Sequence, residues 1–380
     1  MGRFDDSDMS GLVDTAVRYD LAESTGPALR MDELDAPALS RRLVELTLGY
    51  GGSRGDEELR RLIGADTGVD ASDVLVTAGA SAAMFLTALV AAGPGGRVVC
   101  TTPSFPPGRT VPKALGAEVV EVALRFDDRY RLDVDAVAAA LTPETGLVSL
   151  ASPQNPSGIR IADDDLRALL TEIDQRAPEA VVLVDETYRH TTFGAAAPPS
   201  VAGMSPRIVT CASLSKSHGA AGLRIGWLTA TEPDLDEQLR RAKFATMICS
   251  STPDELAATE ILHNSAAVLA PRRAALATAL DTLTEWAGRH TELVDFLPPD
   301  GGALCCLRLR ADTIDDAAVA RFPAALAERD TRVAPGHWFG ESDRVFRLGF
   351  GHLPAELFGP ALDRLGDALH AIAPEPVRHR

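Results

Sequence analysis

Lys216 is the residue whose type and surroundings point most directly to chemistry, and it lies in the stretch SLSKSHGAAGLRIGW (213–227). Of the 37 basic residues in the chain, only three are lysines: Lys113, Lys216 and Lys243. Arginine stays protonated in proteins, whereas a lysine whose pKa falls can lose its proton and act as a nucleophile. A lone lysine after a strand is usually a solvated surface group. The apolar residues before Lys216 and the Gly-Ala-Ala-Gly run after it favour a nucleophile instead.

Asp185 ends another apolar stretch, AVVLVDETY (180–188), and we expect its carboxylate to be buried. A buried carboxylate needs a partner, which is either an arginine elsewhere in the chain or a protonated ring nitrogen. Two further polar clusters follow apolar stretches: TAGAS (77–81), and SPQNPSG (152–158), which contains Asn155. A helix that begins at TAGAS would offer free N–H groups to a phosphate, although a tight structural turn would look the same. SPQNPSG could equally be only a loop.

These clusters belong to a chain in which short apolar strands alternate with helices. We expect strands at 74–80, 97–103, 146–156, 180–188 and 207–216, and helices such as 81–93 and 163–177 between them. The alternation predicts an α/β fold with a mainly parallel sheet covered on both faces, and ligands bind such sheets beyond the carboxyl ends of the strands. From about residue 250 the pattern changes to helices at 253–290, shorter strands at 301–310 and 344–350, and a closing helix at 355–372. Residues 1–45 are expected to be polar and irregular.

Composition limits the class of protein further. The net charge of −17 argues against nucleic acid or an anionic membrane as the main partner. No apolar run is long enough for a membrane span, and the N-terminus MGRFDDSDMSG lacks the basic-then-apolar pattern of a signal peptide. The five cysteines show no CxxC spacing and the eight histidines no HExxH spacing, so we expect reduced thiols and no metal site. A cytoplasmic protein is the expectation.

Eight segments, in order, resemble those of the class I/II aminotransferases, which are fold-type-I enzymes that use pyridoxal 5'-phosphate (PLP). They are YGGSRGDEELR (50–60), VTAGAS (76–81), TPSF (102–105), NPSG (155–158), DETY (185–188), SLSKSHGAAGLRIGW (213–227), APGHWFG (334–340) and FRLGF (346–350). The resemblance implies a large PLP-binding domain over residues 46–270, with a mainly parallel seven-stranded sheet flanked by helices. It also implies a smaller α+β domain over residues 271–380, to which an N-terminal arm, residues 1–45, contributes.

For the cofactor, the resemblance implies that Lys216, Asp185 and Tyr188 are the catalytic residues. Lys216 would form the Schiff base and then act as general base and acid at the substrate Cα. Asp185 would pair with the ring nitrogen, and Tyr188 and Asn155 would hydrogen-bond the phenolic oxygen. Phe105 would stack on the ring. The phosphate would be held by Gly79, Ala80 and Ser81, by Ser213, Ser215 and Arg224, and by Tyr50 reaching over from the second subunit of a homodimer with shared active sites.

For the substrate, the resemblance implies that Arg347 binds the α-carboxylate with its planar guanidinium fork. Asn155, Thr25 and Gly26 are the further expected contacts, because the segment from Glu23 to Gly26 lies where this family closes over the substrate. His218, two residues after the lysine, is either a packing residue or one that leans into the substrate site. Arg189 and His190 are expected to be structural.

The leading interpretation is an aminotransferase that moves an amino group between an L-amino acid and a 2-oxo acid. The alternative is a PLP-dependent lyase or cyclase, since ESTGP, GDEELR, NPSG and the lysine segment are similar to those of capreomycidine-synthase-like enzymes, which cyclise a hydroxylated arginine. A regulatory protein that uses this fold only to bind an effector is a third interpretation. The retention of Lys216, Asp185 and Arg224 and the acidic charge argue against it. The sequence does not identify the side-chain pocket, so donor and acceptor stay open.

Overall fold

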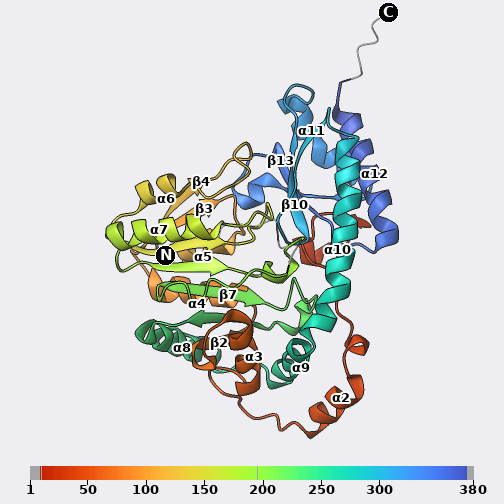
Figure 1. The fold of residues 1–380 in the computed structure, drawn as a ribbon. Helices are drawn as coiled ribbons and strands as arrows, with labels where there is room; N and C mark the ends of the chain where they lie inside the picture. The colour runs from red at the N-terminus through yellow and green to blue at the C-terminus, as the bar shows by residue number, and fades with distance from the viewer. Residues whose placement is uncertain (1–8, 10, 195, 375–380) are drawn as a thin grey trace, which may run out of the picture.

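A seven-stranded sheet forms the core of the larger part of the protein (Figure 1). The structure is a computed structural model that describes residues 9, 11–194 and 196–374. The strands lie in the order β2-β8-β7-β6-β5-β3-β4. Their bounds are β2 Val74–Thr77, β3 Arg97–Thr102, β4 Glu118–Ala123, β5 Thr145–Ala151, β6 Val181–Asp185, β7 Ile208–Ser213 and β8 Gly226–Ala230. Only β8 runs antiparallel to its neighbours, β2 and β7. The predicted α/β fold with a mainly parallel sheet is confirmed.

Helices cover both faces of this sheet because successive side chains of a strand point to opposite faces. Val98 packs on one face with α4 (Ala80–Ala91), α5 (Pro107–Ala114) and α8 (Pro233–Met247). Its neighbour Val99 packs on the other face with α6 (Val134–Ala140) and α7 (Asp163–Arg176). Near β2 and β8, α3 (Glu57–Thr67) and α9 (Thr252–His263) complete the cover. Strands buried on both faces explain why the sequence shows continuous apolar runs there.

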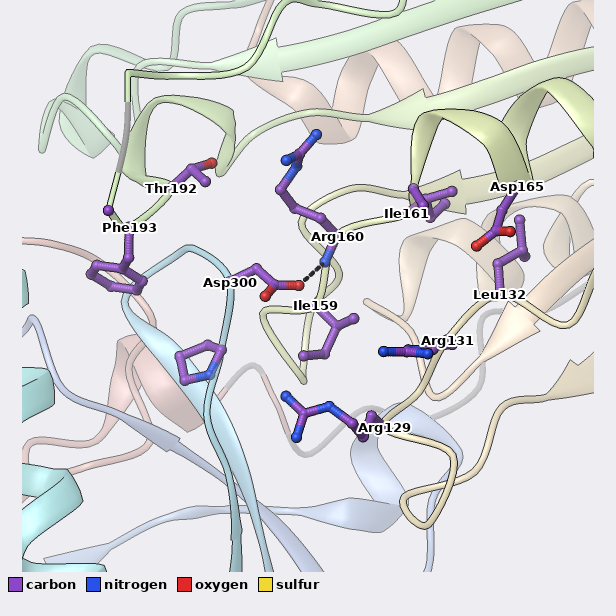
Figure 2. A pocket seen from close by; sticks show the side chains of 13 residues that line it. Arg129, Arg131, Leu132, Ile159, Arg160, Ile161, Asp165, Thr192, Phe193 and Asp300 are labelled. Carbon is purple, nitrogen blue, oxygen red and sulfur yellow. Dashed lines mark hydrogen bonds between the residues drawn. The ribbon is translucent and has the colours of Figure 1, made fainter.

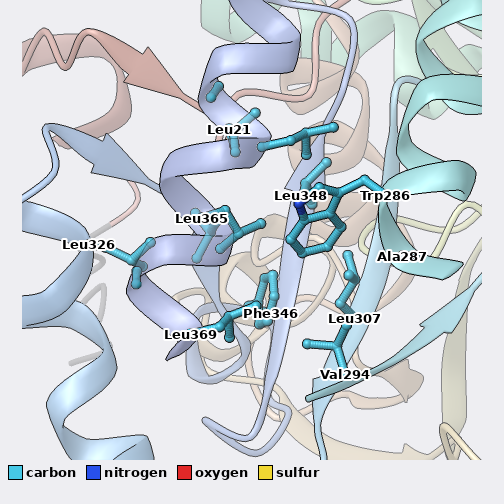
Figure 3. Close-up of a cluster of buried hydrophobic side chains, with 14 of the residues drawn as sticks. Leu21, Trp286, Ala287, Val294, Leu307, Leu326, Phe346, Leu348, Leu365 and Leu369 are labelled. Carbon is cyan, nitrogen blue, oxygen red and sulfur yellow. The ribbon is translucent and has the colours of Figure 1, made fainter. Parts of the chain in front are cut away.

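A second, four-stranded antiparallel sheet follows α10 (Ser265–Gly288), in the order β12-β13-β10-β9. Its strands are β9 Val294–Leu297, β10 Leu304–Leu309, β12 Ala334–Pro335 and β13 Val345–Gly349, and α11 (Asp316–Ala327) and α12 (Ala355–Ile372) pack beside it. Figure 3 shows the core between these elements, where Trp286, Leu307, Phe346 and Leu365 meet. The N-terminal strand β1 (Tyr19–Asp20) pairs with β11 (Thr331–Arg332), so the N-terminal segment packs against the C-terminal part of the chain here.

The N-terminal region differs from the expectation of an irregular arm. It contains α1 (Gly11–Asp14), β1 and the ten-residue helix α2 (Ala36–Glu45). The Asp35 side chain caps α2 by accepting a hydrogen bond from the Ala38 N–H at 3.2 Å, and such a cap offsets the unpaired N–H groups of a helix start. The predicted domain limit at 270/271 falls inside α10, and the division itself stays a prediction.

Within the described part of the chain, no helix combines the length and the apolar character that a membrane span requires. The expectation of no signal peptide rests largely on residues 1–8 and 10, which lie outside the described residues.

Candidate active site

Three of the predicted residues lie at the carboxyl ends of neighbouring strands of the large sheet. Asp185 ends β6, Lys216 follows β7, and Asn155 follows β5. The Lys216 Nζ donates to Glu23 Oε1 and to Ser24 Oγ, each at 3.1 Å. The parallel strands therefore bring these side chains to one edge of the sheet, and the N-terminal segment closes over the lysine there.

Asp185 is held rigidly in a buried position, as predicted. It is 9% exposed, and its Oδ1 accepts hydrogen bonds from the N–H of Thr187 at 3.0 Å and from the hydroxyl of the same residue at 2.5 Å. Burial raises the pKa of Asp185 above its ordinary value, while the bonds from Thr187 and the charge of Lys216 act in the opposite direction. A buried carboxylate with this geometry is suited to pair with a cationic ring nitrogen.

The start of α4 forms a cradle for an anion. Its N-cap is Gly79, at φ +80°, and no side chain caps the helix. A Cβ at Gly79 would lie 2.5 Å from the Arg224 guanidinium, and one at Gly226 would lie 2.7 Å from the Ala80 nitrogen, so the backbone and the guanidinium are packed together here. The guanidinium of Arg224 also donates to the Ser215 hydroxyl at 3.3 Å. Free helix N–H groups, a guanidinium and a hydroxyl at one point fit a phosphate group.

Arg347, on β13, reaches the same region from the small sheet in a buried state. Its side chain is 2% exposed, and its Nη1 donates to Asn155 Oδ1 at 2.9 Å. Its Nη2 donates to the Ala22 carbonyl, and its guanidinium lies 4.8 Å from the Phe339 ring centre. The buried Nε has no hydrogen-bond partner among the described residues. A buried guanidinium with an unused N–H is suited to a carboxylate ligand.

The N-terminal segment lies against the predicted catalytic side chains. Tyr188 donates to Ser24 Oγ at 3.1 Å, and Lys216 donates to Glu23 and Ser24, so these two residues contact the catalytic side chains. The Thr25 hydroxyl lies 3.3 Å from His352 Nδ1, and a Cβ at Gly26 would lie 3.5 Å from the Lys216 carbonyl. Contact of Thr25 and Gly26 with the substrate stays a prediction.

Two of the remaining predicted phosphate residues adjoin the cradle. Ser213 accepts a 3.4 Å bond from the Ser215 N–H, and Ser81 lies in the first turn of α4. Phe105 follows β3 and packs half-buried against the core under α4 and α5. Tyr50 is 85% exposed and has no hydrogen-bond partner among the described residues, so it does not join the site of its own subunit.

A family model for aminotransferase class I and II matches residues 33–365. The chain belongs to this family. It is 29% identical over 320 residues to the capreomycidine synthase of Streptomyces vinaceus, covering 83% of this chain and 80% of that protein. It is 34% identical over 204 residues, 51% of each chain, to an arginine–pyruvate transaminase of Pseudomonas aeruginosa. Its structure matches a PLP-dependent aminotransferase from Streptococcus suis with a TM-score of 0.87 and 25% identity, over 97% of this chain and 98% of that one. The predicted fold, enzyme class and PLP cofactor are thereby confirmed.

His218 in this aminotransferase packs behind the site. It is fully buried, its Nε2 lies 3.1 Å from the Ser265 hydroxyl, and its ring meets the edge of His190 at 5.4 Å. His190 in turn pairs with Asp66 at 2.8 Å, and Arg189 pairs with the same carboxylate. These contacts support the structural interpretation of Arg189 and His190, which stays a prediction, and His218 belongs to their cluster.

Because His218 is buried, the free energy of unfolding of the enzyme is expected to fall as the pH becomes acidic. Burial, with the charges of His190, Arg272 and Arg189, lowers the pKa of His218 to about 3, against the opposing effect of Asp66. The unfolded chain protonates this ring below about pH 6.5, whereas the folded protein keeps it neutral, so stability present above that pH is lost as pH falls toward 3. At pH 5 the loss amounts to about 2 kcal/mol.

The variant His218→Gln should therefore lose correspondingly less stability between pH 7 and pH 5, because its amide does not titrate. Urea unfolding of both proteins at the two pH values measures this difference. An equal loss in the two proteins would contradict a neutral buried His218.

A cavity of about 740 Å³ lies outside this site, and Figure 2 shows it lined by Arg129, Arg131 and Arg160. The Arg160 N–H donates to Asp300 Oδ2 at 2.9 Å across its wall. None of the predicted cofactor or substrate residues lines it, so we do not assign it to the reaction.

Proposed function

We propose that this enzyme transfers an amino group between an L-amino acid and a 2-oxo acid, with Lys216 as the covalent anchor of the cofactor. The observation that carries the proposal is the convergence of Lys216, Asp185 and Arg347 on one edge of the sheet beside the uncapped start of α4. When bound, PLP supplies an electron sink for charge that develops at the substrate Cα. The cradle of Gly79, Ser215 and Arg224 would hold its phosphate.

The side chains of the protein would then have separate tasks. The Lys216 amine would remove and return the proton at the substrate Cα, because an amine can act as a general base and then as a general acid. Asp185 would keep the ring nitrogen of the cofactor protonated. Tyr188 would hold the phenolic oxygen of the cofactor, exchanging the Ser24 contact that it makes here. Arg347, fixed by Asn155, would orient the substrate through its α-carboxylate.

The second candidate is a lyase or cyclase that uses the same first proton transfer. The similarity to capreomycidine synthase over most of both chains supports it, as does Glu23, an additional carboxylate next to Lys216 that could move a proton at Cβ or beyond. The two candidates differ in the fate of the amino group.

A half-reaction experiment separates the two candidates. The holoenzyme is mixed with single L-amino acids in the absence of a 2-oxo acid, and the cofactor absorbance and products are followed. Conversion of the cofactor to its amine form, with one equivalent of 2-oxo acid, supports transamination. Release of ammonia or of a cyclised product with recovery of the starting band supports the second candidate. A protein that takes up no PLP would contradict both.

We also propose a homodimer in which Tyr50 completes the phosphate site of the partner subunit. Large apolar side chains are exposed in two segments: Met31, Val44, Leu48 and Tyr50 in one, Phe244 and Ile248 in the other. A Cβ at Gly51 would lie 2.9 Å from a Thr252 methyl group, so the chain after Tyr50 lies against the start of α9. An exposed apolar surface of this kind fits a second copy of the chain.

The double variant Val44→Asp/Leu48→Asp is expected to be monomeric and to bind PLP at least about tenfold more weakly, because two charges would be buried in the interface and the partner's Tyr50 would be lost. Sedimentation velocity and a PLP titration measure the two effects. The control Ala139→Asp/Arg167→Asp adds the same residues on the exposed surfaces of α6 and α7 and should stay dimeric. A dimeric Val44→Asp/Leu48→Asp variant would contradict this interface.

We further propose the cytoplasm as its location. All five cysteines have free thiols, four of them buried, as a reducing compartment allows.

A further inference from the structure

Glu23 places a carboxylate directly against the catalytic amine. Its Oε1 lies 3.1 Å from Lys216 Nζ and also accepts the Ser24 N–H at 2.8 Å, and its side chain is 20% exposed. The backbone of Glu23 is pinned to β13, because a Cβ at Gly349 would lie only 1.8 Å from the Glu23 carbonyl oxygen. Gly349 is two residues from Arg347. The carboxylate is therefore fixed between the lysine and the proposed carboxylate clamp.

The carboxylate of Glu23 is kept ionised by its neighbours. Burial acts to raise its pKa, but the charge and hydrogen bond of Lys216, the charge of Arg347 and the Ser24 N–H together lower the pKa below its ordinary value. The positive charge nearest to Glu23 is thus the Lys216 ammonium.

Covalent attachment of the cofactor, which the proposed function requires, would turn the Lys216 ammonium into a nitrogen that is neutral unless it is protonated. While that nitrogen is neutral, a mostly buried carboxylate would lack its partner, and such a group costs free energy until another cation pairs with it. The Arg347 guanidinium is not available in full, because it donates to Asn155 and to the Ala22 carbonyl and would bind the substrate carboxylate. A cationic group of the ligand would supply the missing charge.

We infer that Glu23 selects amino acids whose side chains carry a guanidinium or ammonium group. The inference rests on the proposed function for the covalent role of Lys216. A guanidinium pairs with a carboxylate through two parallel hydrogen bonds, which gives both affinity and orientation. The same carboxylate repels a substrate with a distal carboxylate, so aspartate and glutamate are poor donors for this enzyme.

Binding without reaction tests this selection first. The probe is 5-guanidinopentanoate, which has the carboxylate and the guanidinium but no α-amine and cannot react. Hexanoate, which has the carboxylate but an uncharged chain, is its counterpart. Calorimetry on the holoenzyme should give roughly 10- to 100-fold tighter binding of the guanidino acid. Glu23→Gln, which has nearly the same shape, should remove that preference. The control Glu292→Gln alters an exposed carboxylate elsewhere and should keep it.

Half-reaction rates supply the second test. Wild type should convert arginine or ornithine with a higher kcat/KM than norleucine, and Glu23→Gln should lower the values for the cationic substrates while sparing norleucine. If Glu23→Gln weakens all amino acids equally, Glu23 binds the α-ammonium and the inference is wrong. If neither probe nor substrate shows a preference in the wild type, the inference is also wrong, although the proposed function stands. If no amino acid reacts at all, the proposed function fails, and the binding of the two probes still decides the role of Glu23.

Discussion

Replacing Lys216 with alanine is expected to abolish turnover, with a loss of at least about 10⁴-fold in the half-reaction, because the variant loses both its covalent anchor and its base at the substrate Cα. The other two lysines cannot substitute. Lys243 is fully buried in α8, and Lys113 lies on α5. The variant should still bind PLP, because the cradle at the start of α4 is unchanged. Borohydride reduction followed by intact-mass measurement should find a cofactor adduct on the wild type and none on the variant.

Two further variants show whether Lys216 is needed as a nucleophile or only as a positive charge. Lys216→Arg keeps a cation beside Glu23 and Asp185 but cannot form a covalent link, so it should be as inactive as Lys216→Ala. Lys113→Ala, on α5, should react normally and keep the adduct. Normal turnover in either Lys216 variant would show that the cofactor is anchored elsewhere.

The parts of the site that could be predicted from the sequence are those that follow regular strands. Val181 to Val184 form a strand buried on both faces, so the next residue, Asp185, had to lie at its carboxyl end in a buried position. The same reasoning placed Lys216 after β7 and Asn155 after β5. Strand order could not be derived this way, and β8, whose antiparallel course inserts it between β2 and β7, was not among the expected strands.

The irregular N-terminal segment shows where this reasoning stops. The contact between Glu23 and Lys216 joins residues 193 positions apart, and no periodicity relates them. In a segment that is neither helix nor strand, alternation does not say which side chain faces inward, so the contacts of Glu23 and Ser24 with the catalytic side chains could not be derived. The sequence offers one hint of this contact: Glu23 is an acidic residue next to the serine and threonine of ESTGP (23–27). The resemblance places this segment at the site, and its packing against β13 shows how Glu23 is held there.

The contact between Arg347 and Asn155, which spans 192 positions, joins the small sheet to the large one. Arg347 lies on β13 and Asn155 lies after β5, so a carboxylate held by this guanidinium is positioned relative to Lys216 by both sheets. The interaction between Arg347 and the substrate carboxylate is therefore expected to orient the substrate Cα toward Lys216 as well as to increase the affinity.

Replacing Arg347 with alanine is accordingly expected to raise KM for the amino acid on the order of 100-fold and to lower kcat as well, because both the charge and the orientation of the substrate are lost. Steady-state kinetics of the half-reaction measure the two effects. Arg347→Lys keeps the charge without the planar fork and should recover only part of the affinity.

Arg347 is also buried and hydrogen-bonded within the protein, so a loss of stability has to be distinguished from a loss of substrate recognition. An amine that lacks the α-carboxylate provides this distinction. In the wild type, arginine should bind far more tightly than agmatine, its decarboxylated counterpart; in Arg347→Ala the two affinities should become similar, since only the carboxylate contact has been removed. A variant that merely unfolds more easily would lower the affinity for both ligands together and keep their ratio. If arginine kept its advantage over agmatine in a folded Arg347→Ala protein, the α-carboxylate would be bound by another group.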